Sequence, residues 1–229
     1  MDLQNKVVVI TGGCQGFGKA LAKAFVKSNS KVIISSNVKL SLSVAASELN
    51  IDSFLSDVTK PEELSVLGEY AVKKYGHIDI WINNAGIQIA PSPVENVDVQ
   101  KLRRLFDINF FGYYYGCQTA ISIMKGQNTG LIININSTAG LDGKSGLSAY
   151  SSSKFAIKGL TESIRKELAE TNVKIYGVYP GGMQTDIYKE KYPSDISEYM
   201  LVDDVANKVI TNLKSDIPEH DQIIKRPSK

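Results

Sequence analysis

The sequence has few of the residues on which disulfides and metal sites depend. Its 229 residues include only two cysteines, Cys14 and Cys117, and two histidines, His77 and His220. Two cysteines form no disulfide framework, and so few cysteine and histidine ligands argue against a transition-metal site. We therefore expect a protein that binds no metal ion.

Long hydrophobic runs and a large net charge are missing as well. The apolar run after Lys6, Val7–Ile10, is far too short for a signal-peptide core or a membrane span. The net charge is +2, with 43% hydrophobic and 22% charged residues, which favours neither nucleic acid nor an anionic membrane as a partner. We expect a cytoplasmic protein whose residues 1–229 form a single domain.

Strand-like and helix-like patterns alternate along the whole chain. Alternation of this kind predicts parallel strands joined by helices, hence an α/β fold with a doubly wound sheet of six to seven strands and helices on both faces. The predicted strands are 7–10, 31–35, 51–55, 78–82, 131–136 and 173–179, with a possible edge strand at 222–225. The predicted helices are 16–28, 39–49, 61–75, 98–125, 149–170 and 202–214.

Glycine and polar residues follow each predicted strand, where ligands of such sheets bind. The first strand leads into Thr11–Gly18, in which Gly12, Gly16 and Gly18 leave room for a pyrophosphate at the start of the next helix. The spacing Gly-x-x-x-Gly-x-Gly departs from the commoner Gly-x-Gly-x-x-Gly, and a tight turn without a ligand is the alternative. Its position after the first strand favours a dinucleotide.

A tyrosine and a lysine share one face of the helix predicted at 149–170. Tyr150 and Lys154 are four residues apart, in line with the apolar Ile157 and Ile164. A buried ammonium is costly, whereas beside a phenol it favours the phenolate and brings the tyrosine toward proton exchange at working pH. The alternative is an amphipathic helix with an ordinary tyrosine and a lysine that reaches solvent.

In these motifs the chain resembles the short-chain dehydrogenase/reductase superfamily. The resemblance covers essentially the whole chain and implies a Rossmann-type sheet that binds a nicotinamide dinucleotide. It also implies hydride transfer between the cofactor and a small alcohol or carbonyl compound. The motifs that carry it are Thr11-Gly12-x-x-x-Gly16-x-Gly18, Asp57, Asn83-Asn84-Ala85-Gly86, Asn109, Ser137, Tyr150-x-x-x-Lys154 and Pro180-Gly181.

The resemblance implies a role for each of four catalytic residues. Tyr150 would exchange a proton with the substrate oxygen, Lys154 would lower the pKa of Tyr150 and hold the nicotinamide ribose, and Ser137 would hydrogen-bond the reacting oxygen. Asn109 would bend its helix and hold a water that links the lysine to solvent. The alternative for Asn109 is a buried amide satisfied by the backbone alone.

The resemblance further implies a set of cofactor contacts. Two of them have plain structural alternatives: Asp57 also suits the turn before the helix at Pro61, and Asn84–Gly86 also suits a simple turn. Besides Tyr150 and Lys154, the expected contacts are Gly12, Gln15, Gly16, Phe17, Gly18, Ser36, Asn37, Asp57, Val58, Asn84, Ala85, Gly86, Pro180, Gly181 and Thr185.

The residues after the second strand bear on the choice of cofactor. An acid there would bind the ribose 2′-hydroxyl of NAD and repel the phosphate of NADP, but the chain has Ser36 and Asn37. Lys39 is a candidate phosphate ligand or, alternatively, a solvated residue at a helix start. We expect NADP in preference to NAD, with NAD as the alternative.

The segment at about 182–200 is irregular, follows the sixth strand and is expected to form a short substrate lid.

The favoured function is an NAD(P)-dependent oxidoreductase of small alcohols or carbonyl compounds, oxoacyl thioesters included. The alternative is a dinucleotide-binding regulator with little turnover. The short C-terminal part disfavours a sugar-nucleotide epimerase, and the missing Gly-x-Ser-x-Gly elbow disfavours a hydrolase. From the resemblance we expect a homodimer or homotetramer built through the helices at 98–125 and 149–170.

Overall fold

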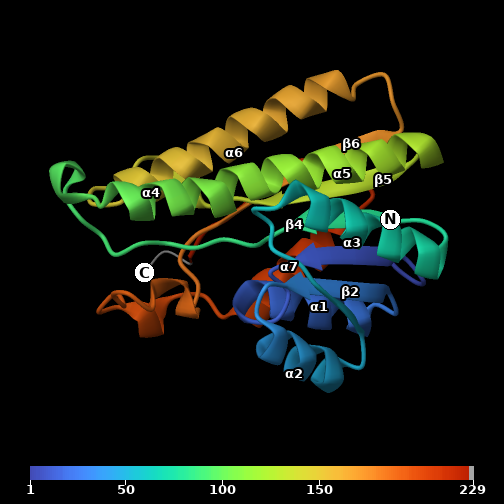
Figure 1. Cartoon of the computed structure of the whole chain (residues 1–229), viewed down its shortest axis with the longest axis horizontal. Coiled ribbons are helices and arrows are strands. Elements are labelled where there is room, and N and C mark those ends of the chain that lie inside the picture. The colour runs from blue at the N-terminus through green and yellow to red at the C-terminus, as the bar shows by residue number, and fades with distance from the viewer. Residues whose placement is uncertain (227–229) are drawn as a thin grey trace.

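A seven-stranded parallel sheet forms the centre of the molecule (Figure 1). The computed structural model describes residues 1–226, so residues 227–229 of the predicted domain lie outside it. The strand order is β3-β2-β1-β4-β5-β6-β7, and all neighbouring strands pair in parallel. The strands are β1 (Val7–Thr11), β2 (Lys31–Ser36), β3 (Asp52–Leu55), β4 (Ile80–Asn83), β5 (Gly130–Ile135), β6 (Val173–Pro180) and β7 (Asp221–Ile224).

Helices cover both faces of this sheet. One apolar core joins the sheet to α1, α2 and α7, and a second joins its other face to α3, α5 and α6. The helices are α1 (Gly16–Lys27), α2 (Lys39–Leu49), α3 (Pro61–Tyr75), α4 (Val99–Phe106), α5 (Gly112–Gln127), α6 (Ser148–Glu167) and α7 (Val202–Lys214). The predicted α/β fold with a doubly wound parallel sheet is confirmed.

Alternation along the strands explains why two cores form. Val8 and Ile10 of β1 point into the first core, whereas Val9 between them points into the second. Every residue of β1 is buried, as expected for a central strand of a sheet that is covered on both faces.

The helix predicted at 98–125 is the main departure from the expected elements. It consists of α4 and α5 joined by a π-helical turn, Asp107–Phe111, whose centre is the buried Asn109. The predicted edge strand is present as β7, which pairs in parallel with β6. The other predicted elements lie within two or three residues of their observed bounds.

Neither a membrane-spanning helix nor a metal-binding cluster occurs in the described part of the chain. No helix there is long and apolar enough to cross a bilayer. Within residues 1–226, no three His, Cys, Asp or Glu side chains gather in a way that would hold a metal ion.

Candidate active site

A cavity of about 1000 Å³ runs along the carboxyl edge of the sheet. Parallel strands bring all their carboxyl ends to this edge, which is why residues far apart in sequence meet there. Every predicted catalytic and cofactor-binding residue lines the cavity except Asn109, which is fully buried behind it.

The Gly-rich turn after β1 is shaped for a close approach of backbone and ligand. Gly12 has φ of +63°, and a Cβ on it would lie 2.8 Å from Cα of Ala85. A Cβ on Gly18 would collide with the Gly12 carbonyl and the Asn84 amide. Both positions therefore require glycine, which keeps the turn and the Asn84 loop in contact.

The start of α1 fits a pyrophosphate group. The helix begins at Gly16, and the preceding Gln15 is extended and forms no side-chain cap, so the first backbone N–H groups have no side-chain partner there. These donors and the helix dipole favour an anion. Gly16 and Phe17, at the start of the helix, line the cavity. The residues present thus fit the phosphates of a dinucleotide without help from a lysine or arginine.

Asp57 occupies the turn after β3. Its carboxylate accepts hydrogen bonds from the Thr59 backbone N–H at 3.0 Å, the Thr59 hydroxyl at 2.8 Å and the Asn37 amide at 3.3 Å. Burial opposes the charge, but these bonds together hold the pKa of Asp57 below its usual value. Asp57 is therefore held in the turn before α3, as its structural alternative had it, and its contact with the cofactor remains a prediction.

The expected site for a 2′-phosphate contains polar groups but no cation. The Ser36 hydroxyl accepts from the Val38 backbone N–H at 3.2 Å and pairs with Cys14 Sγ at 3.3 Å. Ser36 and Asn37 line the cavity, whereas Lys39 is not among its lining residues. Lys39 is thus placed as the solvated residue that the sequence left open as an alternative.

Asn84 fastens the loop after β4 to the Gly-rich turn. Its side-chain amide donates to the Thr11 carbonyl at 2.9 Å and to the Gly12 carbonyl at 3.1 Å. Its backbone N–H donates to the Thr11 hydroxyl at 3.0 Å. The Asn-Ala-Gly segment is therefore held as one face of the cavity rather than as a free turn.

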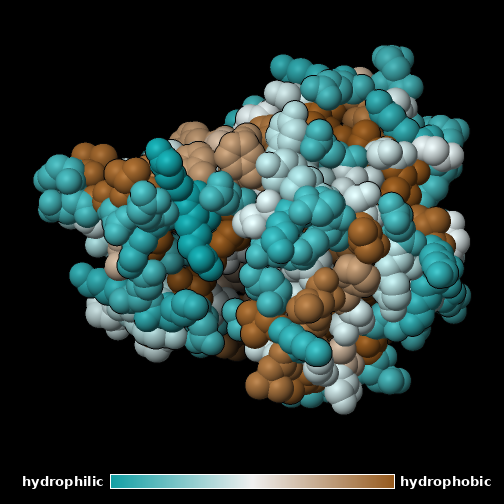
Figure 2. Space-filling view, in the orientation of Figure 1, coloured by the Kyte–Doolittle hydropathy of each residue, from teal (hydrophilic) through white to brown (hydrophobic). Residues whose placement is uncertain are grey.

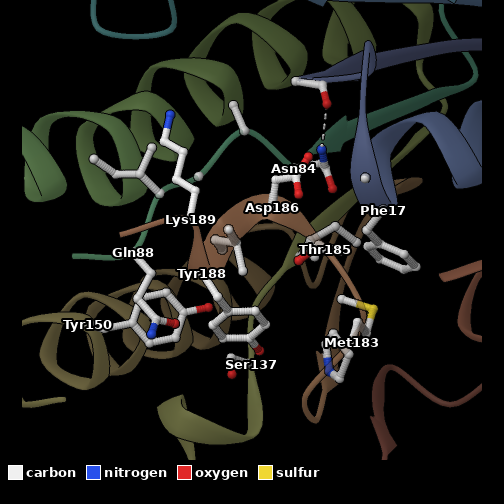
Figure 3. A pocket seen from close by; sticks show the side chains of 18 of the residues that line it. Phe17, Asn84, Gln88, Ser137, Tyr150, Met183, Thr185, Asp186, Tyr188 and Lys189 are labelled. Atoms are coloured by element: carbon white, nitrogen blue, oxygen red, sulfur yellow. Dashed lines mark hydrogen bonds between the residues drawn. The ribbon is translucent and has the colours of Figure 1, made fainter. Parts of the chain in front are cut away.

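Tyr150 and Ser137 meet at the inner end of the cavity (Figure 3). The Tyr150 side chain comes from the first turn of α6, and Ser137 directly follows the end of β5. Burial raises the pKa of Tyr150, and the neighbouring Tyr188 phenol raises it further, whereas a hydrogen bond from Ser137 lowers it. At neutral pH the Tyr150 phenol therefore keeps its proton.

Lys154 is buried one helical turn further along α6, with 3% of its surface exposed. Its ammonium donates to the Ile135 carbonyl at 3.1 Å and lies 5.7 Å from the Tyr150 ring centroid. Burial lowers the pKa of Lys154 to about 7. Burial dominates the pKa of Tyr150 in this structure, and the expectation that Lys154 lowers it remains a prediction.

Asn109 supports the site from behind the cavity. Its side chain accepts from the Ile87 backbone N–H and donates to the Ile87 carbonyl, both at 2.9 Å. It also donates to the Ser153 hydroxyl at 3.3 Å, and Ser153 in turn donates to the Tyr150 carbonyl at 2.7 Å. Asn109 therefore bonds to the backbone of Ile87 and also to the Ser153 side chain, so it joins the loop after β4 to α6, and the water that the resemblance implies remains a prediction.

Residues of the segment predicted to form a lid line the cavity, and its action as a lid remains a prediction. A bridge between Met183 and Met200 closes its base, and the Tyr188 and Tyr199 rings pack edge to face at 5.6 Å. Two contacts hold it down: the Glu190 carboxylate accepts from Lys101 at 3.0 Å and from the Ala90 backbone N–H at 3.1 Å. Thr185 reaches the Gly-rich turn, since a Cβ on Gly16 would lie 3.6 Å from its methyl group.

Sequence reasoning missed three groups that line the same cavity as Tyr150. Figure 3 shows the Gln88 amide and the Tyr188 ring beside the Tyr150 phenol. Tyr188 belongs to the segment expected to form the lid, but nothing in the sequence pointed to either of these particular side chains. The third is Asn136, a buried lining residue whose Nδ2 has no hydrogen-bond partner within residues 1–226.

Comparisons with known proteins identify the family. The model of the short chain dehydrogenase family matches residues 6–195. An uncharacterized oxidoreductase of Staphylococcus aureus (strain USA300) is 33% identical over 221 residues, which cover 95% of this chain and 94% of the relative.

Solved structures share the fold along the whole chain. A short chain dehydrogenase/reductase from Burkholderia phymatum in complex with NAD has a TM-score of 0.89 at 23% identity, covering 99% of this chain and 90% of that one. The 3-ketoacyl-(acyl-carrier-protein) reductase from Brucella melitensis complexed with NADH has a TM-score of 0.89 at 25% identity, covering 97% and 98%. The chain belongs to the short-chain dehydrogenase/reductase family of oxidoreductases.

Proposed function

We propose that this protein transfers a hydride between a nicotinamide dinucleotide and a small alcohol or carbonyl compound. The observation that carries the proposal is the meeting of the Tyr150 phenol, the Ser137 hydroxyl and the buried Lys154 ammonium at one end of a cavity. The other end of that cavity is the Gly-rich turn and the uncapped start of α1, which fit the phosphates of a dinucleotide.

The residues divide the work of the reaction between them. The bound dinucleotide would supply or accept the hydride. Tyr150, which is protonated at neutral pH, would donate its proton to a carbonyl oxygen during reduction and take it back during oxidation. Ser137 would hydrogen-bond the same oxygen as charge develops on it, and Lys154 would bind the ribose and help to return the proton.

Replacing Tyr150 by Phe tests this function. The change removes the proton donor but keeps the buried ring, so cofactor binding should persist while turnover of a panel of alcohols and ketones falls by about 100-fold or more. Turnover is read from the absorbance of the reduced nicotinamide, and binding from quenching of protein fluorescence. A variant that keeps most of the turnover would contradict the assigned role.

The alternative is a protein that binds the dinucleotide and regulates another process. It predicts cofactor binding by the wild-type protein without turnover of any member of the panel. The complete set of Asn109, Ser137, Tyr150 and Lys154 supports the enzyme instead, because a binding protein needs no buried acid-base pair.

Cofactor preference, assembly and location remain predictions. The missing carboxylate after β2 supports NADP over NAD, although no cation lines that part of the cavity.

A homodimer or homotetramer is supported by Phe111, Tyr114 and Phe155, which are 43%, 42% and 44% exposed. Figure 2 shows apolar side chains at the surface of the layer formed by α4, α5 and α6. Solution scattering tests the assembly, and a monomeric mass would contradict it. A cytoplasmic location is unchanged as an expectation.

A further inference from the structure

The two halves of the cavity differ in charge. The half around the Gly-rich turn and the ends of β2 and β3 is lined by no lysine or arginine, and Asp57 gives it one carboxylate. The half beneath the lid is lined by several cations and a single carboxylate, that of Asp186. The cations at this end, besides the catalytic Lys154, are Arg104, Lys144, Lys189, Lys191 and Arg226.

Two of these cations already have partners of opposite charge. Lys144 pairs with Asp142 at 2.6 Å, and Arg226 pairs with Asp195 at 3.0 Å. The Asp186 carboxylate accepts a hydrogen bond from the Tyr192 hydroxyl at 2.9 Å and forms no ion pair with any of the described residues. Neither of these ion pairs involves the remaining cations, Arg104, Lys189 and Lys191.

Arg104, Lys189 and Lys191 form no ion pair within residues 1–226. The acid next to Lys189 in sequence is Glu190, but its carboxylate is bound by Lys101 and by the Ala90 backbone N–H. Three unpaired cations thus come from two separate elements, α4 and the lid, to line one cavity. Cations that line a cavity without an ion-pair partner favour an anionic ligand there.

Figure 3 shows how one of these cations, Lys189, lies relative to Tyr150. In Figure 3 the Lys189 side chain leaves the lid and extends toward the green helical ribbon, with Gln88 and Tyr150 below it. Figure 2 shows strongly hydrophilic side chains over the end of the molecule where α4 and the lid lie. Lys189 and Arg104 therefore line the same cavity as Tyr150.

We propose that the substrate is an anion, with a carboxylate or phosphate that is held by Lys189 and Arg104 while its carbonyl or alcohol oxygen reaches Tyr150 and Ser137. This inference rests on the proposed oxidoreductase function and names the substrate class of the same site. The cofactor does not need these side chains, because its phosphates fit the backbone donors at the start of α1. The cations therefore serve the second ligand.

Matched substrate pairs test the proposal. The carboxylate arm uses 2-oxobutanoate, 3-oxobutanoate and 4-oxopentanoate, each beside its methyl ester. The phosphate arm uses 3-oxobutanoyl coenzyme A beside the neutral N-acetylcysteamine thioester. With each reduced cofactor, we expect at least one anion to exceed its neutral partner about 10-fold or more in kcat/KM. That advantage should shrink as salt is added, because screening weakens exposed charge interactions.

Side-chain replacement then locates the effect. The double variant Lys189→Gln/Arg104→Gln should lose most of the preference for the anion and most of its salt dependence, while the neutral partner changes less than about twofold. Lys174→Gln is the matched control, since Lys174 is also exposed and unpaired among residues 1–226 but lies on β6 outside the cavity. Equal kcat/KM for anionic and neutral partners, or an unchanged preference in the double variant, would overturn the proposal.

A binding readout separates this inference from the proposed function. With cofactor present, the anions but not the esters should raise the melting temperature, and the double variant should lose this shift. Anion-dependent stabilisation without turnover would support the anion site and refute the oxidoreductase. Turnover of neutral members alone would support the oxidoreductase and refute the anion site. Neither turnover nor stabilisation by any member would refute both.

Discussion

The Lys154 ammonium and the Tyr113 hydroxyl donate to the same acceptor, the backbone carbonyl of Ile135, at 3.1 and 2.7 Å. The ammonium also lies 5.3 Å from the centroid of the Tyr113 ring. Tyr113 belongs to α5 and Lys154 to α6, so this carbonyl at the end of β5 fixes both helices to the strand that leads into Ser137. The arrangement gives a buried lysine a fixed place without a carboxylate.

A double-mutant cycle should reveal this shared acceptor. Tyr113→Phe and Lys154→Met each leave the Ile135 carbonyl one side-chain donor, whereas the double variant removes both. We expect the double variant to lose about 1 kcal/mol more of the unfolding free energy than the sum of the single changes. Urea unfolding measures each corner of the cycle.

Tyr114→Phe supplies the control for that cycle. Tyr114 follows Tyr113 on the same helix but is 42% exposed and makes no contact with Lys154. Its combination with Lys154→Met should be additive within about 0.5 kcal/mol. If the effects of Tyr113→Phe and Lys154→Met are additive too, the Tyr113 hydroxyl and the Lys154 ammonium bind the Ile135 carbonyl independently, which would contradict the prediction.

The parts of this site that sequence could predict are those that depend on local pattern. Strand ends follow from alternation and from glycine, so the positions of Gly12, Asn84 and Ser137 along one edge could be foreseen. A bend of the helix at Asn109 was implied by the resemblance, but its hydrogen-bond partner Ile87, 22 residues away, could not be foreseen. Nothing in the local pattern of the helix marks such a partner.

The electrostatics of Lys154 also lay beyond the sequence. Spacing indicated a lysine beside a phenol, and a charged lysine would favour the phenolate. Whether it is charged depends on burial and on the absence of a nearby acid, which only the packed structure settles. The same holds for the lid, where Glu190 reaches Ala90, 100 residues earlier in the chain.

The stability of the protein should rise with pH because of Lys154. Burial lowers its pKa in the folded protein from the usual 10.5 to about 7. Between these two values the unfolded chain binds the proton and the folded protein does not, so raising the pH favours folding. The free-energy penalty for burying Lys154 is largest below pH 7 and disappears above the pKa that Lys154 has in the unfolded chain.

Lys154→Met removes this penalty and so isolates it. The variant should gain unfolding free energy over the wild type near pH 7, and the gap should narrow by roughly 3 kcal/mol on going to about pH 9.5. Urea unfolding of both proteins at the two pH values measures the gap. Parallel pH dependences would show that Lys154 stays charged when folded.

Asn109→Leu should destabilise the protein and disturb α6. The leucine fills similar space but leaves the buried N–H and carbonyl of Ile87 without their side-chain partner, at a cost of about 2–4 kcal/mol. Ser153→Ala should cost only about 1 kcal/mol, because the Ile87 pair survives. Thermal and urea unfolding give both values, and equal losses would contradict the leading part assigned to Ile87.

A carboxylate at position 36 should change which dinucleotide binds. The wild-type protein is predicted to bind NADP more tightly than NAD, because neither Ser36 nor Asn37 repels a 2′-phosphate. In Ser36→Asp the new carboxylate would accept from the 2′-hydroxyl of NAD and repel the phosphate of NADP. The ratio of the two dissociation constants should therefore shift toward NAD by about 10-fold or more. Fluorescence quenching by each cofactor measures the ratio.

Ser43→Asp separates this local effect from a change in overall charge. It adds the same negative charge at an exposed position of α2 outside the cavity, so the ratio of NADP to NAD affinity should stay within about twofold of the wild type. A wild-type protein that already prefers NAD would overturn the predicted preference. A ratio that moves equally in both variants would place the discrimination in the net charge of the protein rather than in the contact at the end of β2.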